Sequence, residues 1–200
     1  EIADDSPTAE NLALEADQII DTGLQEGTDT AVVRVYAFDS TTIDLCLSVF
    51  WWATFRKTKG GIKLHTLYDI KTSITCFVHV SPASVHDVNA LDLLYYEPGG
   101  YYILDRGYID YERLFRIHQS FASFVVRAKN NLQYRRMYSN KVNKDSGILL
   151  DQIGKLTGFY ISKDYPEKLR RIKFYDEETD NDLMFLSNNF ELTAEEIAQL

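Results

Sequence analysis

Two short apolar runs along the chain each end in a single carboxylate. Residues 101–104 are apolar or aromatic and lead into Asp105, and residues 32–38 lead in the same way into Asp39. Apolar runs of this length, rich in β-branched and aromatic residues, predict buried strands. Because neighbouring strand ends can present acids to a common metal ion, we predict that Asp39 and Asp105 belong to one site.

The pattern between these two runs predicts a hairpin and a helix. Residues 62–69 alternate apolar and polar side chains and should pair with a strand over 73–80. Ser84 is expected to cap a helix that carries Asp87 in its first turn and ends before Pro98.

The chain changes character after residue 128. A helix is expected over 111–119 and a strand over 121–128. Thr193 and Glu196 can form a capping box that opens a last helix, which is too short as it stands and looks truncated at residue 200. Between the strand over 121–128 and this last helix, short strand-like pieces separated by turns indicate an antiparallel β insertion: 133–138, 147–150, 158–162, 169–175 and 183–186.

This order of elements resembles the ribonuclease-H-like arrangement. We therefore expect an α/β fold, with a ribonuclease-H-like mixed sheet, helices and an antiparallel β insertion. In that arrangement, clustered carboxylates bind two divalent cations, one activating the nucleophile and one stabilising the leaving oxygen. A plainer interpretation stays open, in which Asp39 caps a strand end and Asp105 forms a turn before Arg106 and Gly107.

The composition is that of a folded, soluble protein. The 200 residues are 45% hydrophobic and 13% aromatic, which is enough for a packed core. No apolar run approaches the roughly 18 residues needed to span a bilayer, and the N-terminus has no signal-peptide pattern. We expect no membrane association and a cytoplasmic location. Cys46 and Cys76 lack partners at zinc-binding spacing, and Cys76 is expected to be a small buried residue.

The net charge of −9 is unevenly distributed. Residues 1–30 contain nine acidic residues and no lysine or arginine, so the remaining 170 residues carry 21 charges of each sign. Residues 113–144 contain eight basic residues and no acidic one. This basic block is a candidate surface for a polyanion such as DNA, although a charge run is more often only a solvated face.

Six segments occur in the order seen in one family: residues 36–45, 53–57, 61–65, 86–88, 104–108 and 124–131. They closely resemble DDE transposases of bacterial insertion sequences, of the IS-four type. The resemblance identifies Asp39 and Asp105 as the first two carboxylates of the DDE triad. The third should be a glutamate in a Tyr-Arg-Glu helix motif after the β insertion. Glu195 and Glu196 lack the preceding Tyr and Arg, so we expect the fragment to stop short of its third ligand and to be inactive alone.

The resemblance also implies cofactors, partners and further site residues. It implies metal-dependent phosphodiester hydrolysis and strand transfer at transposon ends, with two Mg²⁺ or Mn²⁺ ions in the full enzyme. The implied partners are double-stranded DNA, as transposon ends and target, and a second copy in a synaptic dimer at the bacterial nucleoid. DNA contacts are expected from basic and polar residues beside the two acids: Lys63, Arg106, Arg127, Lys129 and Asn130.

Domain boundaries and alternatives complete these expectations. We expect an acidic segment of unclear origin over 1–33, the first part of the catalytic core over 34–128, the β insertion over 129–190 and the start of the truncated helix over 191–200. One alternative is a ribonuclease-H-like nuclease without strand transfer. Another is an inactive transposon remnant that acts only as a DNA-binding or interaction module.

Overall fold

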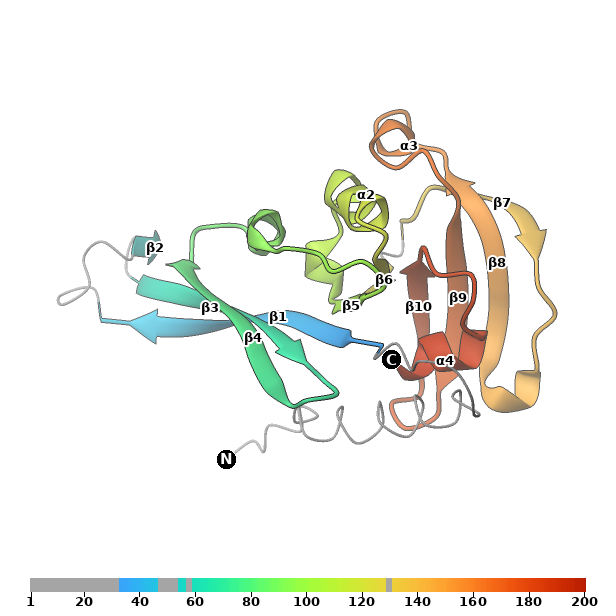
Figure 1. Ribbon diagram of the computed structural model, residues 1–200, viewed down its shortest axis with the longest axis horizontal. Coiled ribbons are helices and arrows are strands. Elements are labelled where there is room, and N and C mark those ends of the chain that lie inside the picture. Colours follow the sequence, from blue (N-terminus) through green and yellow to red (C-terminus); the bar gives the residue numbers. More distant parts are fainter. Residues whose placement is uncertain (1–32, 47–53, 57–58, 129–130) are drawn as a thin grey trace.

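The strands pair into one large, strongly twisted sheet (Figure 1). The computed structural model describes residues 33–46, 54–56, 59–128 and 131–200. Within these ranges ten strands share the sheet. They are β1 (Val35–Leu45), β2 (Thr54–Arg56), β3 (Lys59–Asp69), β4 (Ile74–Pro82), β5 (Tyr101–Leu104), β6 (Ser123–Arg127), β7 (Tyr134–Ser139), β8 (Ile148–Leu156), β9 (Leu169–Asp176) and β10 (Asn181–Ser187).

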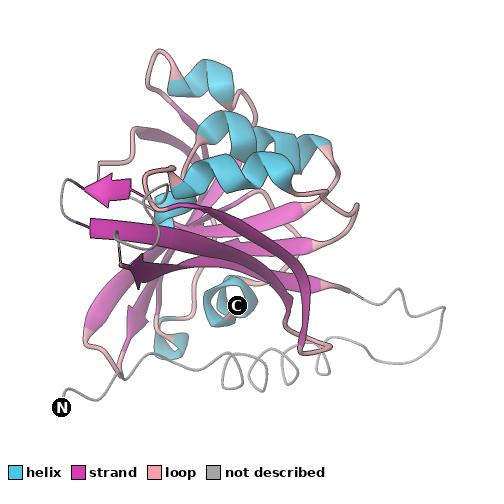
Figure 2. Cartoon of the chain, turned by 90° about the vertical axis from the view of Figure 1, so that its left-hand side faces the viewer, coloured by secondary structure: helices cyan, strands magenta, loops and turns pink. Residues whose placement is uncertain are grey.

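Helices are few and short. The α-helices are α2 (Tyr111–Gln119), α3 (Ile161–Asp164) and α4 (Ala194–Gln199), and the 3-10 helices are η1 (Asp87–Leu93), η2 (Arg106–Tyr108) and η3 (Lys144–Ser146). Figure 2 shows most of the helices on one side of the sheet and α4, near the C-terminus, on the other. The fold is therefore a mixed α/β fold with a large sheet, as the sequence predicted at that level.

Parallel and antiparallel pairing divide the sheet. The strand order is β2-β3-β1-β5-β6-β10-β9-β8-β7, with β4 also paired to β3. The β1, β5 and β6 strands are parallel neighbours, whereas β3 and β4 form the predicted antiparallel hairpin beside β1. The β7–β10 strands are antiparallel, as expected for the β insertion, and β10 joins them to β6. The β insertion thus extends the central sheet.

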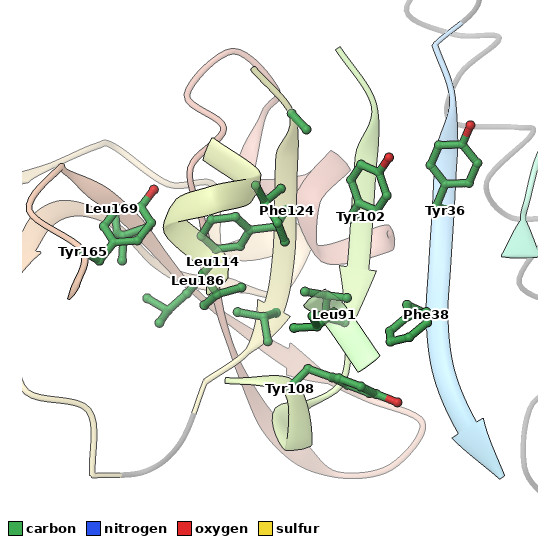
Figure 3. Packing of buried hydrophobic residues seen from close by; sticks show 14 of the residues in the cluster. Tyr36, Phe38, Leu91, Tyr102, Tyr108, Leu114, Phe124, Tyr165, Leu169 and Leu186 are labelled. Carbon is green, nitrogen blue, oxygen red and sulfur yellow. The ribbon is translucent and has the colours of Figure 1, made fainter. Parts of the chain in front are cut away.

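Alternating side chains give the sheet two different faces. On the first face, which we call the helix face, Phe38 and Leu104 are buried with Leu91 of η1 and Leu114 of α2 (Figure 3). On the second face, the α4 face, Val125 packs in a cluster with Ile197 of α4, and Leu200 packs against Val35. The residue parity along β1, β5 and β6 therefore decides which face a side chain reaches.

One predicted strand is a helix instead. Residues 158–162 were expected to be extended, but Ile161–Asp164 forms α3. Ile161 and Tyr165 both pack on the helix-face core, and the amide of Tyr165 donates to the Ile161 carbonyl. Their spacing of four residues matches a helical turn, and a short apolar run does not distinguish helix from strand.

Two smaller expectations also fail. The helix after the hairpin begins at Asp87 as a 3-10 helix, with His86 rather than Ser84 at the N-cap. Cys76 is exposed rather than buried, as is Cys46. Cys76 lies on β4, which pairs only with β3 in the described ranges, and its neighbours at alternate positions, Ile74 and Val78, are exposed as well.

A buried ion pair joins two strands of the β insertion. The guanidinium of Arg170 donates to both carboxylate oxygens of Asp151, at 2.9 and 2.8 Å. Their side chains are only 6% and 4% exposed, and Arg170 also donates to the Leu192 carbonyl ahead of α4. Two charges held so far from water must stay paired, because either one alone would remain desolvated.

We therefore expect Asp151→Ala to lower the free energy of unfolding by about 3–5 kcal/mol, measured by urea denaturation. The matched control is Asp182→Ala, which removes the exposed partner of Lys173 and should cost no more than about 1 kcal/mol. Similar losses in the two variants would contradict the role assigned to the buried pair.

Candidate functional site

The three parallel strands bring residues from distant parts of the chain to one level. Phe38 of β1 pairs with Leu104 of β5, and Leu104 pairs with Val126 of β6. The next residue on each strand is Asp39, Asp105 and Arg127, respectively. Two acids and one base thus directly follow residues that are paired at one level of the sheet.

All three side chains belong to the α4 face. Asp39 has the parity of Val35 and Ala37, which pack in the cluster with Leu200, and Asp105 has the parity of Ile103 in the same cluster. Arg127 has the parity of Val125, which packs with α4 residues. All three are exposed, so solvent or a ligand can reach them.

The strands part where the acids begin. β5 ends at Leu104, whereas β1 continues beside β3 as far as Leu45. Asp39 is therefore the first β1 residue beyond the pairing with β5, and Asp105 is the first residue beyond β5 itself. Diverging strand ends expose both carboxylates without requiring a break in the core below them.

Local hydrogen bonds orient each acid. The amide of Ser40 donates to Asp39 Oδ1 at 2.7 Å. Asp105 Oδ2 accepts from the Gly107 amide at 3.3 Å and caps η2, so the turn-forming role foreseen for this residue is present. A carboxylate has about four acceptor positions, so this cap leaves room for a further ligand.

A buried tyrosine lies beneath the two acids. Tyr108 follows Asp105 in η2, and its ring packs on Phe38 with 5.1 Å between centroids (Figure 3). Its hydroxyl is buried beside Ser40 without a hydrogen bond of ordinary geometry. Burial raises the pKa of this phenol, the neighbouring Ser40 hydroxyl lowers it, and the negative charges of Asp87, Asp39 and Asp105 raise it. The phenol therefore experiences the electrostatic field of all three acids.

On the helix face, a polar cluster lies behind Asp39. Ser40 Oγ donates to Asp87 Oδ1 at 2.8 Å, and Lys63 Nζ lies 3.1 Å from the same oxygen. Lys63 also donates to the Val85 carbonyl at 2.9 Å. Burial tends to raise the pKa of Asp87, but the hydrogen bonds from Ser40 and Lys63 and the charges of Lys63 and His65 lower it on balance. Asp87 is thus held as a carboxylate at the first residue of η1.

Comparison with known proteins gives the family. The family model described as the transposase DDE domain matches residues 32–200. The chain belongs to this family. Two curated relatives that it matches are named as transposases.

Two relatives illustrate the extent of the match. The chain is 25% identical over 170 residues to a protein described as a probable transposase for insertion sequence element IS5377 of Geobacillus stearothermophilus, covering 81% of the chain and 42% of that protein. It is 28% identical over 196 residues to the putative transposase y4zB of Sinorhizobium fredii, covering 96% and 53%. The chain thus spans about half the length of the curated relatives it matches.

Solved structures give distant matches. Endonuclease V from Bacillus subtilis is 9% identical with a TM-score of 0.35, covering 98% of this chain and 82% of that one. The Streptomyces avermitilis enzyme of the same name is 10% identical with a TM-score of 0.34, covering 99% and 84%.

The residues expected to contact DNA differ in their exposure and in the face of the sheet on which they lie. In the transposase domain, Arg106 and Arg127 are exposed, and neither forms an ion pair within the described ranges. Lys63 is on the helix face, with a side chain only 13% exposed and its ammonium group engaged by Asp87. It therefore lies on the face opposite that of Asp39. Lys129 and Asn130 lie outside the described residues.

Folding neutralises part of the basic block. Arg113 binds Asp92 and Asp110, and Arg116 binds Asp92 and Glu112. These acids precede residue 113 in the sequence, so a count of charges within residues 113–144 did not include them. The block is consequently not one continuous basic surface, and Arg127 is better placed than Arg113 or Arg116 to meet a polyanion.

The domain's third acid is not found beside the pair. No group of three or more His, Cys, Asp or Glu side chains could hold a metal ion in the part of the chain that the structure describes. Glu195 accepts from Ser146 Oγ, and Glu196 completes the capping box with Thr193, so both have other partners. The donors at the site are the two carboxylates of Asp39 and Asp105.

Within the same ranges, no helix is long and apolar enough to cross a membrane.

Sequence reasoning missed Ser40 and the bonds of Asp87. Asp87 was assigned only a favourable place at a helix start, although residues 86–88 were among the family-like segments. That segment was the sequence feature that could have marked Asp87 as a functional residue. The residues that Asp87 contacts could not be predicted from the sequence.

The position of Tyr108 predicts an unusual mutational result. Because its hydroxyl is buried without a partner of good geometry, Tyr108→Phe should not lower the free energy of unfolding and should raise it by up to about 1 kcal/mol. Chemical denaturation of the two proteins measures the difference. A clear loss of stability would mean that the hydroxyl has a partner.

Proposed function

We propose that the full-length protein is a DNA transposase in which Asp39 and Asp105 are catalytic and bind a divalent metal ion. It would hydrolyse phosphodiesters at transposon ends and transfer the freed 3′-hydroxyl to target DNA. The observation that carries the proposal is the β1–β5 register, which leaves two exposed carboxylates at the same level where the strands part.

The donor chemistry fits magnesium or manganese. Mg²⁺ prefers oxygen ligands, keeps several waters and is often held by only one or two carboxylates together with substrate phosphates. In the full enzyme, two such ions would supply charge stabilisation for both the attacking and leaving oxygens. The third carboxylate would come from outside the present chain, which would leave this fragment inactive alone.

The topology also supports a ribonuclease-H-like core. An antiparallel β4-β3-β1 unit continues into parallel β5 and β6. Asp39 lies on β1 just beyond its pairing with β5, and Asp105 directly follows β5. The α4 face, to which both acids belong, receives a helix from beyond the β insertion. A helix on this face is where a further acid could approach the pair.

DNA would approach along the exposed carboxyl ends of these strands. Arg127 is one strand away from Asp105 at the same level, and Arg106 directly follows it. A guanidinium can form two hydrogen bonds to a phosphate, so these residues can hold the backbone while the acids face the reacting phosphate. Lys129 and Asn130 would extend this contact. A homodimeric synaptic complex and action in the bacterial cytoplasm remain part of the proposal.

The first test replaces each acid separately in the full-length protein. Asp39→Asn and Asp105→Asn should each reduce strand cleavage by about 10²–10⁴-fold, because each removes a charged metal ligand, while end binding is retained. Cleavage and gel-shift assays measure the two properties. The control Asp176→Asn alters a partly exposed acid at the end of β9 and should leave cleavage unchanged. Metal-dependent cleavage that survives in either site variant would refute the assignment.

The second test compares two exposed arginines. Arg127→Ala should weaken duplex binding because one phosphate contact is lost. It should also reduce the slope of the logarithm of the affinity against the logarithm of the salt concentration by about one. Arg116→Ala should leave both properties unchanged, since Asp92 and Glu112 already neutralise Arg116. Fluorescence anisotropy at several salt concentrations measures them. Equal effects would contradict the division of the basic block.

A further inference from the structure

We propose that Asp87 is a positioning residue that fixes the end of β1 behind Asp39, an inference that rests on the proposed function. Asp87 starts η1, yet it bonds to two strands of the sheet. It accepts from Ser40 of β1 and is paired with Lys63 of β3. One carboxylate thus ties a helix start to neighbouring strands, one of which carries the proposed metal ligand.

The need for such a tie follows from the sheet topology. Up to Phe38, β1 has β3 on one side and β5 on the other. From Asp39 onward it is paired only with β3, so the backbone loses half of its lateral hydrogen-bonding support at the residue that must hold a ligand. One residue later, the Ser40–Asp87 bond attaches β1 to the start of η1 in addition to its pairing with β3.

Strand geometry transmits this attachment to Asp39. Consecutive side chains on a strand point to opposite faces of the sheet. A bond that holds the Ser40 side chain on the helix face therefore fixes the direction in which the Asp39 side chain points on the α4 face. The Ser40 amide in turn donates to Asp39 Oδ1. Ser40 is therefore bonded to Asp87 through its hydroxyl and to Asp39 through its amide.

Lys63 completes the arrangement. Its ammonium group reaches both Asp87 and the Val85 carbonyl, which holds the residues ahead of η1 against β3. The Lys63 side chain is largely buried and that of Asp87 is 34% exposed, so this pair is partly shielded from solvent. Asp87 does not itself reach the exposed pair of acids, because its bonds lie on the opposite face of the sheet.

The experiment compares Asp87→Ala and Ser40→Ala with Asp92→Ala. Asp92 is a matched control because it lies on the same 3-10 helix and also loses ion pairs, but its partners are Arg113 and Arg116 of α2. In metal-free protein, the amide NMR signals of Asp39 and Ser40 should shift in Asp87→Ala and not in the control, whereas Ser40→Ala is assessed by its metal dependence. A loss of fold in Asp87→Ala leaves Ser40→Ala to decide, since it removes only a hydroxyl.

The second readout is the Mn²⁺ dependence of strand cleavage by the full-length protein. The half-saturating Mn²⁺ concentration should rise about tenfold in Asp87→Ala and Ser40→Ala, with a nearly unchanged kcat at saturating metal and an unchanged KM for DNA. Asp92→Ala should match the wild type.

Two results would overturn the inference. One is a folded Asp87→Ala protein with wild-type signals and wild-type Mn²⁺ dependence, or a folded Ser40→Ala protein with wild-type Mn²⁺ dependence. The other is an equal effect in Asp92→Ala, which would show general destabilisation. Full cleavage by Asp39→Asn is a separate outcome, because it would remove the proposed function itself and the positioning role with it.

Discussion

The parallel register between β1, β5 and β6 is the constraint on which the site depends. Pairing of Phe38 with Leu104, and of Leu104 with Val126, brings together three strand ends that are far apart in sequence. Their alternate side chains form the helix-face core, so moving one strand by a single residue would turn its apolar side chains away from that core. Core packing therefore specifies the relative positions of Asp39, Asp105 and Arg127.

The two faces of the sheet divide the chemistry at this edge. The α4 face presents exposed acids and a base, whereas the helix face holds the partly buried cluster of Ser40, Lys63 and Asp87. Charge works differently in the two settings. An exposed carboxylate can exchange water for a metal ion or a phosphate-bound cation, but a carboxylate already bonded to a lysine and a hydroxyl is committed to holding structure.

Local sequence patterns predicted the elements that depend on local information. The end of β5, the β3–β4 hairpin, α2 and the capping box of Thr193 are present because alternation, apolar runs and caps act over a few residues. The end expected for the first strand at Asp39 is wrong, because β1 continues beside β3 to Leu45. The pattern failed at α3, where a short apolar run fits either period, and at Cys76, whose burial depended on an unknown sheet neighbour. The Arg170–Asp151 and Arg113–Asp92 pairs join residues about 20 positions apart, so a charge count along the chain could not reveal them. The metal-site assignment rested on family resemblance, and the structure adds the common level and face of the two acids.

The most direct measurement is paramagnetic broadening of amide NMR signals by Mn²⁺ at a concentration well below that of the protein. A shared metal site predicts that the signals of Asp39, Ser40, Asp105 and Arg106 broaden together and first, because a bound paramagnetic ion relaxes nearby nuclei. Broadening centred on the acidic β9–β10 turn, with these strand-end signals intact, would contradict the account.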